Sequence, residues 1–127
     1  MSSVRPDRFA VEVSPAGGFH VLGWYPVMTP QRALGADSVA CASLTDSLVL
    51  WTDHYAAQCV QARNTPVENL LSLYRRPRTV EGRALFTGQA SKDGAEGLSF
   101  EQVIVLIDRL LAHASARTLD RQVLAAS

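Results

Sequence analysis

The sequence predicts a single α+β domain, in which a small mixed sheet is packed by two main helices. Three observations predict this class: 127 residues suffice for one hydrophobic core, strand-like and helix-like apolar patterns are intermixed, and no repeat or linker divides the chain. The patterns lack a regular β–α–β alternation, so α+β is favoured over a doubly wound sheet. We expect the domain to cover residues 8–112, with 113–127 as a C-terminal helical extension or a frayed tail.

A β-hairpin is expected at the amino terminus. Residues 8–13 alternate apolar and polar side chains, and residues 19–25 are rich in β-branched and aromatic side chains, both typical of strands. Gly17 and Gly18 between them permit the positive φ of a tight turn. Pro26 ends the second strand, because proline has no N–H to donate to a sheet.

Short elements follow the hairpin. Thr29, which precedes a proline, predicts the N-cap of a short helix that ends at Gly35. Residues 38–42 and 48–52 are then expected to form strands, and the second of these is the more apolar. Residues 57–62 are a further strand candidate.

The first main helix is expected at about 66–75. Its start is marked by Thr65 as the N-cap, by a proline at the first helical position and by Glu68, which completes a capping box. Beyond this helix, residues 83–87 are expected to form a buried strand. Residues 91–97 are rich in turn formers and are expected to form a loop.

The second main helix is expected at about 99–112. Ser99 and Gln102 make another capping box, and the apolar side chains that follow lie on one broad face. Val105 and Leu106 extend that face beyond a simple stripe. Deeper burial within the domain is the favoured explanation, and the alternative is a homodimer in which these two residues pack against a second subunit.

Charge and cysteine content argue against several classes of function. The 12 basic and 12 acidic residues balance, so a nucleic-acid partner and a DNA mimic are both disfavoured. No apolar run approaches the ~20 residues that cross a bilayer and no signal peptide is visible, so we expect a cytoplasmic protein without a membrane partner. Two cysteines, Cys41 and Cys59, are too few for a secreted disulfide scaffold, and whether they are bonded stays open.

The common catalytic and metal-binding signatures are missing from the sequence. It contains no phosphate-binding loop, no G-x-S-x-G elbow, no H-E-x-x-H and no C-x-x-C. We therefore expect no metal and no cofactor, and no motif identifies a catalytic residue. Asp53 and His54 come nearest to an acid–base pair. Adjacent strand residues point to opposite faces, so these two would cooperate only if a turn reorients them.

Arginines gather in the region that follows the first main helix. Arginine binds phosphate and carboxylate through two parallel hydrogen bonds, so this group could hold a small anionic ligand. The alternative, somewhat favoured, is that the charges complement the helix dipole and face solvent. Strand aromatics could also line a pocket, although they lie more often in the core. The candidate ligand-binding residues are Arg75, Arg76, Arg78, Arg83, Asp53, Asn64 and Trp51.

Several segments follow one another in a characteristic order. They are ALGADSV at 33–39, DSLVLWTD at 46–53, RNTPVENLL at 63–71, VEGRALFTGQ at 80–89 and EGLSFEQV at 96–103. Over about residues 8–112 this order resembles domain-of-unknown-function family 3846, small proteins of actinobacterial phages and mobile elements. The resemblance implies an accessory protein and supplies no reaction. Asp53 and Asn64 match polar positions of its pattern, whereas DHYAAQ at 53–58 departs from its acidic, glycine-containing turn.

Our leading expectation is a non-enzymatic accessory binding protein of a phage or mobile element. It would engage a host protein or a small anionic ligand, and one specific version is a nucleotide-signal sponge that acts against host defence. Two alternatives stay open. One is a nucleic-acid-associated factor that uses the four arginines, and the other is an enzyme of unrecognised type around Asp53 and His54.

Overall fold

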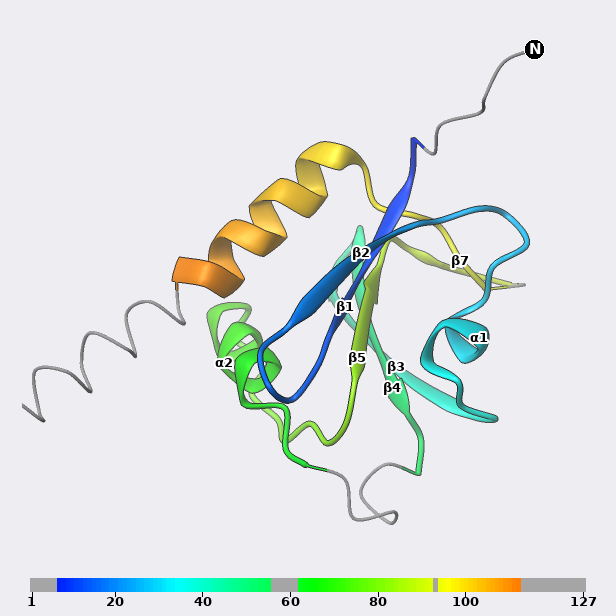
Figure 1. Ribbon diagram of the computed structural model, residues 1–127. Coiled ribbons are helices and arrows are strands. Elements are labelled where there is room, and N and C mark those ends of the chain that lie inside the picture. The colour runs from blue at the N-terminus through cyan, green and yellow to red at the C-terminus, as the bar shows by residue number, and fades with distance from the viewer. Residues whose placement is uncertain (1–6, 56–61, 93, 113–127) are drawn as a thin grey trace, which may run out of the picture.

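The computed structural model describes residues 7–55, 62–92 and 94–112, and it confirms the α+β class (Figure 1). Its main sheet is antiparallel throughout and not mixed as expected, with the strand order β2-β1-β5-β4-β3. Its strands are β1 (Phe9–Val13), β2 (Phe19–Gly23), β3 (Val39–Thr45), β4 (Leu48–Asp53) and β5 (Ala84–Thr87). The remaining elements are α1 (Pro30–Leu34), α2 (Thr65–Leu73), the small strands β6 (Ala90–Ser91) and β7 (Gly94–Ala95), and a helix at 100–112.

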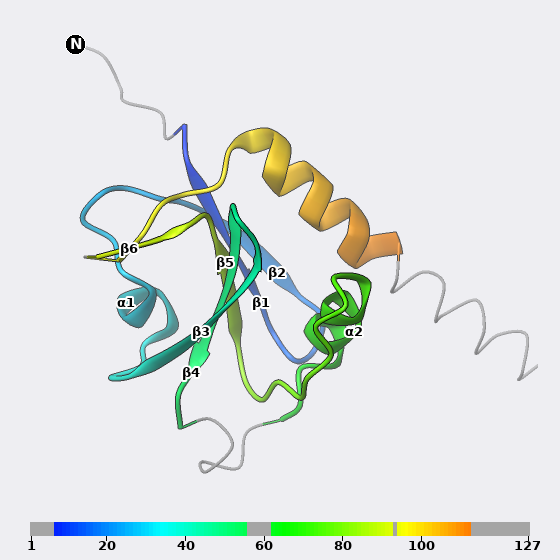
Figure 2. The ribbon, with the colours of Figure 1, turned by 180° about the vertical axis from the view of Figure 1, so that it is seen from behind.

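The sheet is covered on both faces. The two views of the ribbon show α2 and the helix at 100–112 on one face, and α1 with the β6–β7 hairpin on the other (Figures 1 and 2). Side chains at alternate strand positions therefore enter two separate apolar clusters. The first cluster is centred on Val11, Leu50, Phe86, Leu71 and Leu106. The second contains Ala10, Trp24, Leu34, Val49, Trp51 and Leu85.

The central strand β5 joins the two halves of the sheet. Phe86 pairs with Val11 of β1 on one side and with Leu50 of β4 on the other. Every residue of β5 is buried. A strand that is buried on both faces is apolar throughout instead of alternating, which explains why residues 84–86 are apolar without interruption.

The amino-terminal hairpin and the short helix are confirmed. β1 pairs with β2 in antiparallel register, and Gly17 adopts a φ of 95° in the turn between them. The Thr29 hydroxyl accepts a hydrogen bond from the Arg32 N–H at 3.3 Å and so caps α1. Gly35 ends α1 with a φ of 63°, a conformation that favours glycine.

The cap of α2 lies one residue earlier than the sequence pattern indicated. Asn64, and not Thr65, is the N-cap, because its side-chain oxygen accepts from the Val67 N–H at 3.3 Å. Both residues are of types that cap helices well, so the pattern alone did not separate them. Asn64 is fully buried, whereas Thr65 is exposed.

The second capping box is confirmed in both directions. The Gln102 N–H donates to the Ser99 hydroxyl at 3.2 Å, and the Ser99 N–H donates to the Gln102 side-chain oxygen at 2.8 Å. The helix that starts here buries Val103, Leu106 and Leu110 against the sheet. Leu106 is only 2% exposed, which confirms the favoured explanation of deeper burial for this residue. Val105, the other residue of the alternative dimer contact, is 49% exposed.

The β6–β7 hairpin stands where a loop was expected at 91–97. Its strands have only two residues each, which is too short for a sequence pattern to reveal. Trp24 fixes the hairpin to the sheet, because its indole N–H donates to the Ala95 carbonyl oxygen at 2.8 Å.

Three sequence expectations concern residues outside the described part of the chain. The strand candidate at 57–62 lies outside it except for its last residue, and Cys59 and the tail at 113–127 lie wholly outside it. In the described ranges, none of the helices combines the length and the apolar character needed to cross a membrane.

Candidate functional site

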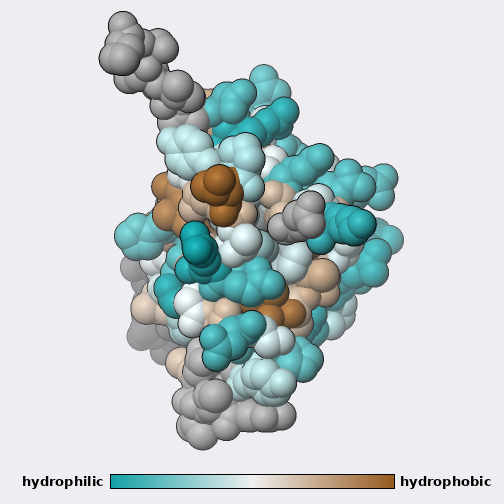
Figure 3. Space-filling model, turned by 90° about the vertical axis from the view of Figure 1, so that its right-hand side faces the viewer, coloured by the Kyte–Doolittle hydropathy of each residue, from teal (hydrophilic) through white to brown (hydrophobic). Residues whose placement is uncertain are grey.

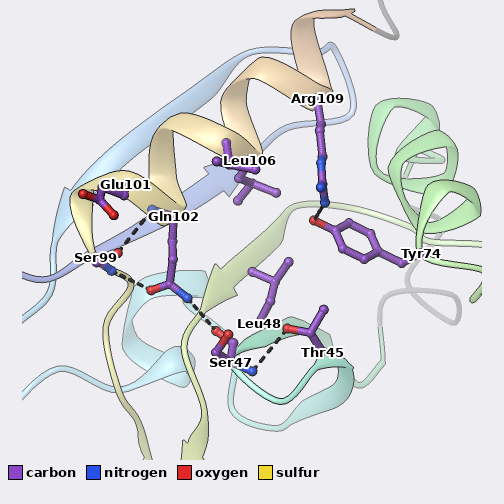
Figure 4. Close-up of a pocket in the computed structure, with 10 residues that line it drawn as sticks. Thr45, Ser47, Leu48, Tyr74, Ser99, Glu101, Gln102, Leu106 and Arg109 are labelled. Atoms are coloured by element: carbon purple, nitrogen blue, oxygen red, sulfur yellow. Dashed lines mark hydrogen bonds between the residues drawn. The ribbon is translucent and has the colours of Figure 1, made fainter.

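A cavity of about 360 Å³ opens where the helix at 100–112 meets the turn between β3 and β4. We call it the helix–hairpin cavity, and Figure 4 shows the side chains around it. The residues that line it are Thr45, Ser47, Leu48, Tyr74, Ser99, Glu101, Gln102, Val105, Leu106 and Arg109. They come from three parts of the chain that are far apart in sequence, so only the fold brings them together.

The floor of this cavity is apolar. Leu48 and Leu106 lie between its two polar ends in Figure 4, and both are buried in the core below. The Gln102 side-chain N–H donates to the Ser47 carbonyl oxygen at 3.4 Å, which joins the first turn of the helix to the β3–β4 turn. The cavity is thus bounded at this end by the same residues that cap the helix.

An arginine and a tyrosine form the other end of the cavity. The Arg109 guanidinium donates to the Tyr74 hydroxyl at 2.6 Å, and its central carbon lies 5.2 Å from the centre of the Tyr74 ring. Both contacts hold the guanidinium in place. The ion pairs among the described residues involve Arg63 and Arg83, so Arg109 is not paired with any described carboxylate and keeps further N–H donors for a ligand.

An exposed apolar side chain stands on the wall of this cavity. Val105, among the described residues that line it, is 49% exposed. An apolar side chain that stays exposed beside a cavity is placed to contact another molecule.

The opposite side of the molecule has a different character. Figure 3 shows the face that carries α1 and the β6–β7 hairpin, where hydrophilic side chains dominate and hydrophobic surface is confined to small separate areas. A shallow cavity of about 450 Å³ lies between α1 and this hairpin, and Trp51 and Lys92 are among the residues that line it. The Trp51 indole N–H donates to the Thr87 hydroxyl at 2.8 Å, so the single hydrogen-bond donor of this side chain is already used within the protein.

The structure divides the four arginines that the sequence placed in one group. Arg75 and Arg76 follow α2 and are exposed, and their backbone N–H groups donate to the last carbonyl oxygens of that helix. The Arg83 side chain instead pairs with Glu12 at 2.9 Å and donates to the Leu34 carbonyl oxygen at the end of α1. Arg83 therefore ties α1 to the sheet.

Asn64 also has a structural position. Its side-chain N–H₂ donates to the Val13 carbonyl oxygen at 3.0 Å and to the Gly82 carbonyl oxygen at 2.9 Å. Together with the cap of α2, these bonds use both donors and the acceptor of the amide. They leave no hydrogen-bonding group of the Asn64 side chain directed at a ligand.

Asp53 and Arg78 come together at a second cavity, of about 300 Å³, which we call the strand-end cavity. Its described lining residues are Ala40, Thr52, Asp53, His54, Arg78, Thr79, Val80 and Glu81. Asp53 and His54 were expected to point to opposite faces, yet both line this cavity. The reason is that β4 ends at Asp53, whose carboxylate accepts from the Tyr55 N–H at 3.0 Å and forms the turn that reorients His54.

Glu68 has a role that its assignment to a capping box did not reveal. Its carboxylate accepts hydrogen bonds from the Arg63 guanidinium and, at 3.1 Å, from the Val80 N–H. The hydrogen bond from Arg63, together with the one from Val80, lowers the pKa of Glu68 below its ordinary value. The carboxylate thereby joins the start of α2 to the segment that leads into β5.

The lowered pKa of Glu68 predicts a pH-dependent part of the stability. The folded protein holds this proton less tightly than the unfolded chain, so the contribution is present above the ordinary glutamate pKa of about 4.3. It is lost as the pH falls through the lowered value. We expect the free energy of unfolding of Glu68→Gln to lie below that of the wild type at neutral pH and to approach it in acid. Urea denaturation across this pH range measures the difference.

Asp37→Asn, which changes an exposed carboxylate without a side-chain hydrogen bond to a described residue, is the control for this measurement. It should follow the wild type throughout. A deficit of Glu68→Gln that stays constant or grows on acidification would contradict the assigned role of Glu68.

In the described ranges, no group of three or more histidine, cysteine, aspartate or glutamate side chains could hold a metal ion. Comparison with protein-family models, with curated proteins and with solved structures found no match. The resemblance to family 3846 therefore stays a prediction.

Sequence reasoning missed the residues that form the ends of the helix–hairpin cavity. Tyr74 belongs to the apolar stripe of α2, and Arg109 has no motif around it. They are 35 residues apart, and no sequence pattern indicated their contact.

Proposed function

We propose that the protein is a non-enzymatic binding protein, and that a partner polypeptide docks at the helix–hairpin cavity. The single observation that carries this proposal is an apolar-floored cavity that has the half-exposed Val105 on its wall and ends in a fixed arginine–tyrosine pair. Tyrosine and arginine are enriched in protein interfaces and at the positions that contribute most to binding. The partner would be a host protein if the resemblance to phage and mobile-element proteins holds.

The lining of the cavity favours binding over catalysis. The described residues that line it include no histidine. The hydroxyls of Thr45 and Ser99 accept hydrogen bonds from backbone N–H groups, and the Tyr74 hydroxyl accepts from Arg109. Among the described residues, none of these three hydroxyls is hydrogen-bonded to a general base, the arrangement that activates a nucleophile.

Charge indicates which partner segment would fit. Arg109 is the basic residue in the described lining, and no ion pair among the described residues involves it. A bulky apolar side chain would fill the space above Leu48 and Leu106. An aspartate or glutamate beside it in the partner would accept from Arg109.

Selection of peptides from a random displayed library tests this proposal. We expect the enriched peptides to share a bulky apolar residue next to an acidic one. Arg109→Glu should weaken their binding about tenfold or more, since loss of a charged hydrogen bond is worth about 1.5–3 kcal/mol. Val105→Asp should also weaken it, because it places a charge on the apolar wall that the partner would contact.

The matched control is Val27→Asp, which places the same charge at a side chain that is 79% exposed and lies outside the cavity. It should bind the peptides as the wild type does. Peptides that bind Val105→Asp and Arg109→Glu with unchanged affinity would contradict the proposal, as would a library that yields no enriched sequence.

A further inference from the structure

The strand-end cavity lies at a row of three short side chains that crosses the sheet, and two of them, Ala40 and Thr52, line it. Ala40 of β3 pairs with Thr52 of β4, and Thr52 pairs with Ala84 of β5. Residues that are directly opposite in antiparallel strands lie on the same face of the sheet. The next row on this face, by contrast, contains Leu50 and Phe86. The side chains of this row are therefore shorter than those of the next row, which leaves a hollow in the surface of the sheet. The segment 78–81 lines this hollow.

Opposite charges line this hollow without neutralising one another. Asp53 stands at the end of β4, and Arg78 and Glu81 come from the segment that leads into β5. Among the described residues, no ion pair within 4.0 Å involves any of the three. Asp53, Arg78 and Glu81 therefore line one space, and none of the three forms an ion pair with another described residue.

The floor of the hollow carries a hydroxyl group. Thr52 lines the cavity and is 7% exposed. A threonine hydroxyl has one donor and two acceptor lone pairs. On the floor of the cavity it can therefore bond a molecule that enters.

We propose that the strand-end cavity binds a small zwitterion that carries an ammonium and a carboxylate, a free amino acid being the simplest. The ammonium lies between Asp53 and Glu81, the carboxylate is bound by Arg78 through two parallel hydrogen bonds, and Thr52 bonds the ligand from below. The volume of about 300 Å³ is at the lower end of the range for small-molecule sites.

The mixed charges favour a zwitterion over either ion alone. A simple anion would bond Arg78 but would also face the two carboxylates, and repulsion from them opposes its binding. A simple amine would satisfy the carboxylates and leave Arg78 without a partner. Only a ligand with both groups matches the whole set, so neither acetate nor methylamine should bind measurably.

Thermal unfolding and calorimetric titration with each of the twenty amino acids test this site. At least one amino acid should raise the melting temperature in a concentration-dependent way, whereas acetate and methylamine should not. Arg78→Gln and Asp53→Asn should each weaken binding about tenfold or more. The amide oxygen that Asp53→Asn introduces can still accept from the Tyr55 N–H, so the turn is kept. Ala40→Leu should abolish binding by filling the hollow.

Arg76→Gln and Asp46→Asn are the matched controls, since they remove the same charges from exposed positions outside the cavity. Both should bind as the wild type does, and so should Val105→Asp, because this site is independent of the helix–hairpin cavity. Absence of a shift with every amino acid at millimolar concentration would overturn the proposal. Equal binding of acetate alone would overturn it too, as would undiminished binding by Arg78→Gln and Asp53→Asn.

Discussion

Replacing Asn64 by alanine is expected to lower the free energy of unfolding by about 3 kcal/mol. The substitution removes the cap of α2, worth about 1 kcal/mol, and leaves the buried carbonyl oxygens of Val13 and Gly82 without their donor. Asn64 joins α2, β1 and the start of β5 through one side chain. Asn64→Asp should cost still more, because it sets a carboxylate oxygen against two carbonyl oxygens.

The neighbouring Thr65→Ala is the control that separates the two possible caps. Thr65 is exposed and is the residue that the capping-box pattern selected. Its substitution should change stability by no more than about 0.5 kcal/mol. Urea denaturation of both variants measures the difference, and equal losses for the two would show that Asn64 is not the residue that joins these elements.

Replacing Gly97 by alanine is expected to cost about 2–3 kcal/mol, because no room exists for the added methyl group. A Cβ at this position would lie 2.5 Å from the Arg8 Cβ, 3.1 Å from the Phe9 backbone nitrogen and 3.2 Å from the Trp24 Cβ. The next residue, Leu98, exchanges two backbone hydrogen bonds with Phe9, at 2.9 and 2.7 Å. A shift here would disturb the segment that leads into the helix at 100–112.

Gly18→Ala is the matched control, because its Cβ would meet only the Ser14 hydroxyl at 3.4 Å. We expect a change within about 0.5 kcal/mol for this variant. Tryptophan fluorescence during denaturation provides the readout, since Trp24 contacts the altered position. A Gly97→Ala protein as stable as Gly18→Ala would contradict the close packing described at this site.

Local signals in the sequence were sufficient for most of the fold. The alternation at 8–13, the turn glycines and the Ser99–Gln102 capping box each depend on neighbours within a few residues, and all are found in the structure. Local signals did not show whether Asn64 or Thr65 is the N-cap of α2. That depends on the hydrogen bonds from Asn64 to Val13 and Gly82, which are close to Asn64 only in the folded protein.

The candidate sites were harder to predict, because each is formed by long-range packing. Arg78 and Asp53 meet at one cavity, whereas Arg83, close to Arg78 in sequence, pairs with Glu12 on the other side of the sheet. Neither arginine belongs to a strand, so no periodicity in the sequence indicated which group each would reach. The short side chains of Ala40 and Ala84 do not by themselves predict a hollow. The hollow follows only from the strand pairing that sets both residues beside Thr52.

The most direct test of the proposed function is to locate a bound peptide on the ¹⁵N-labelled protein by NMR titration. A peptide with a bulky apolar residue beside an acidic one should shift the backbone amides of residues 45–48 and 99–109 in a saturable way. The amides of Thr29 and Gln31 and those at 78–81, beside the other two cavities, should stay unchanged. Saturable shifts confined to those other segments, with none at 45–48 or 99–109, would contradict the account.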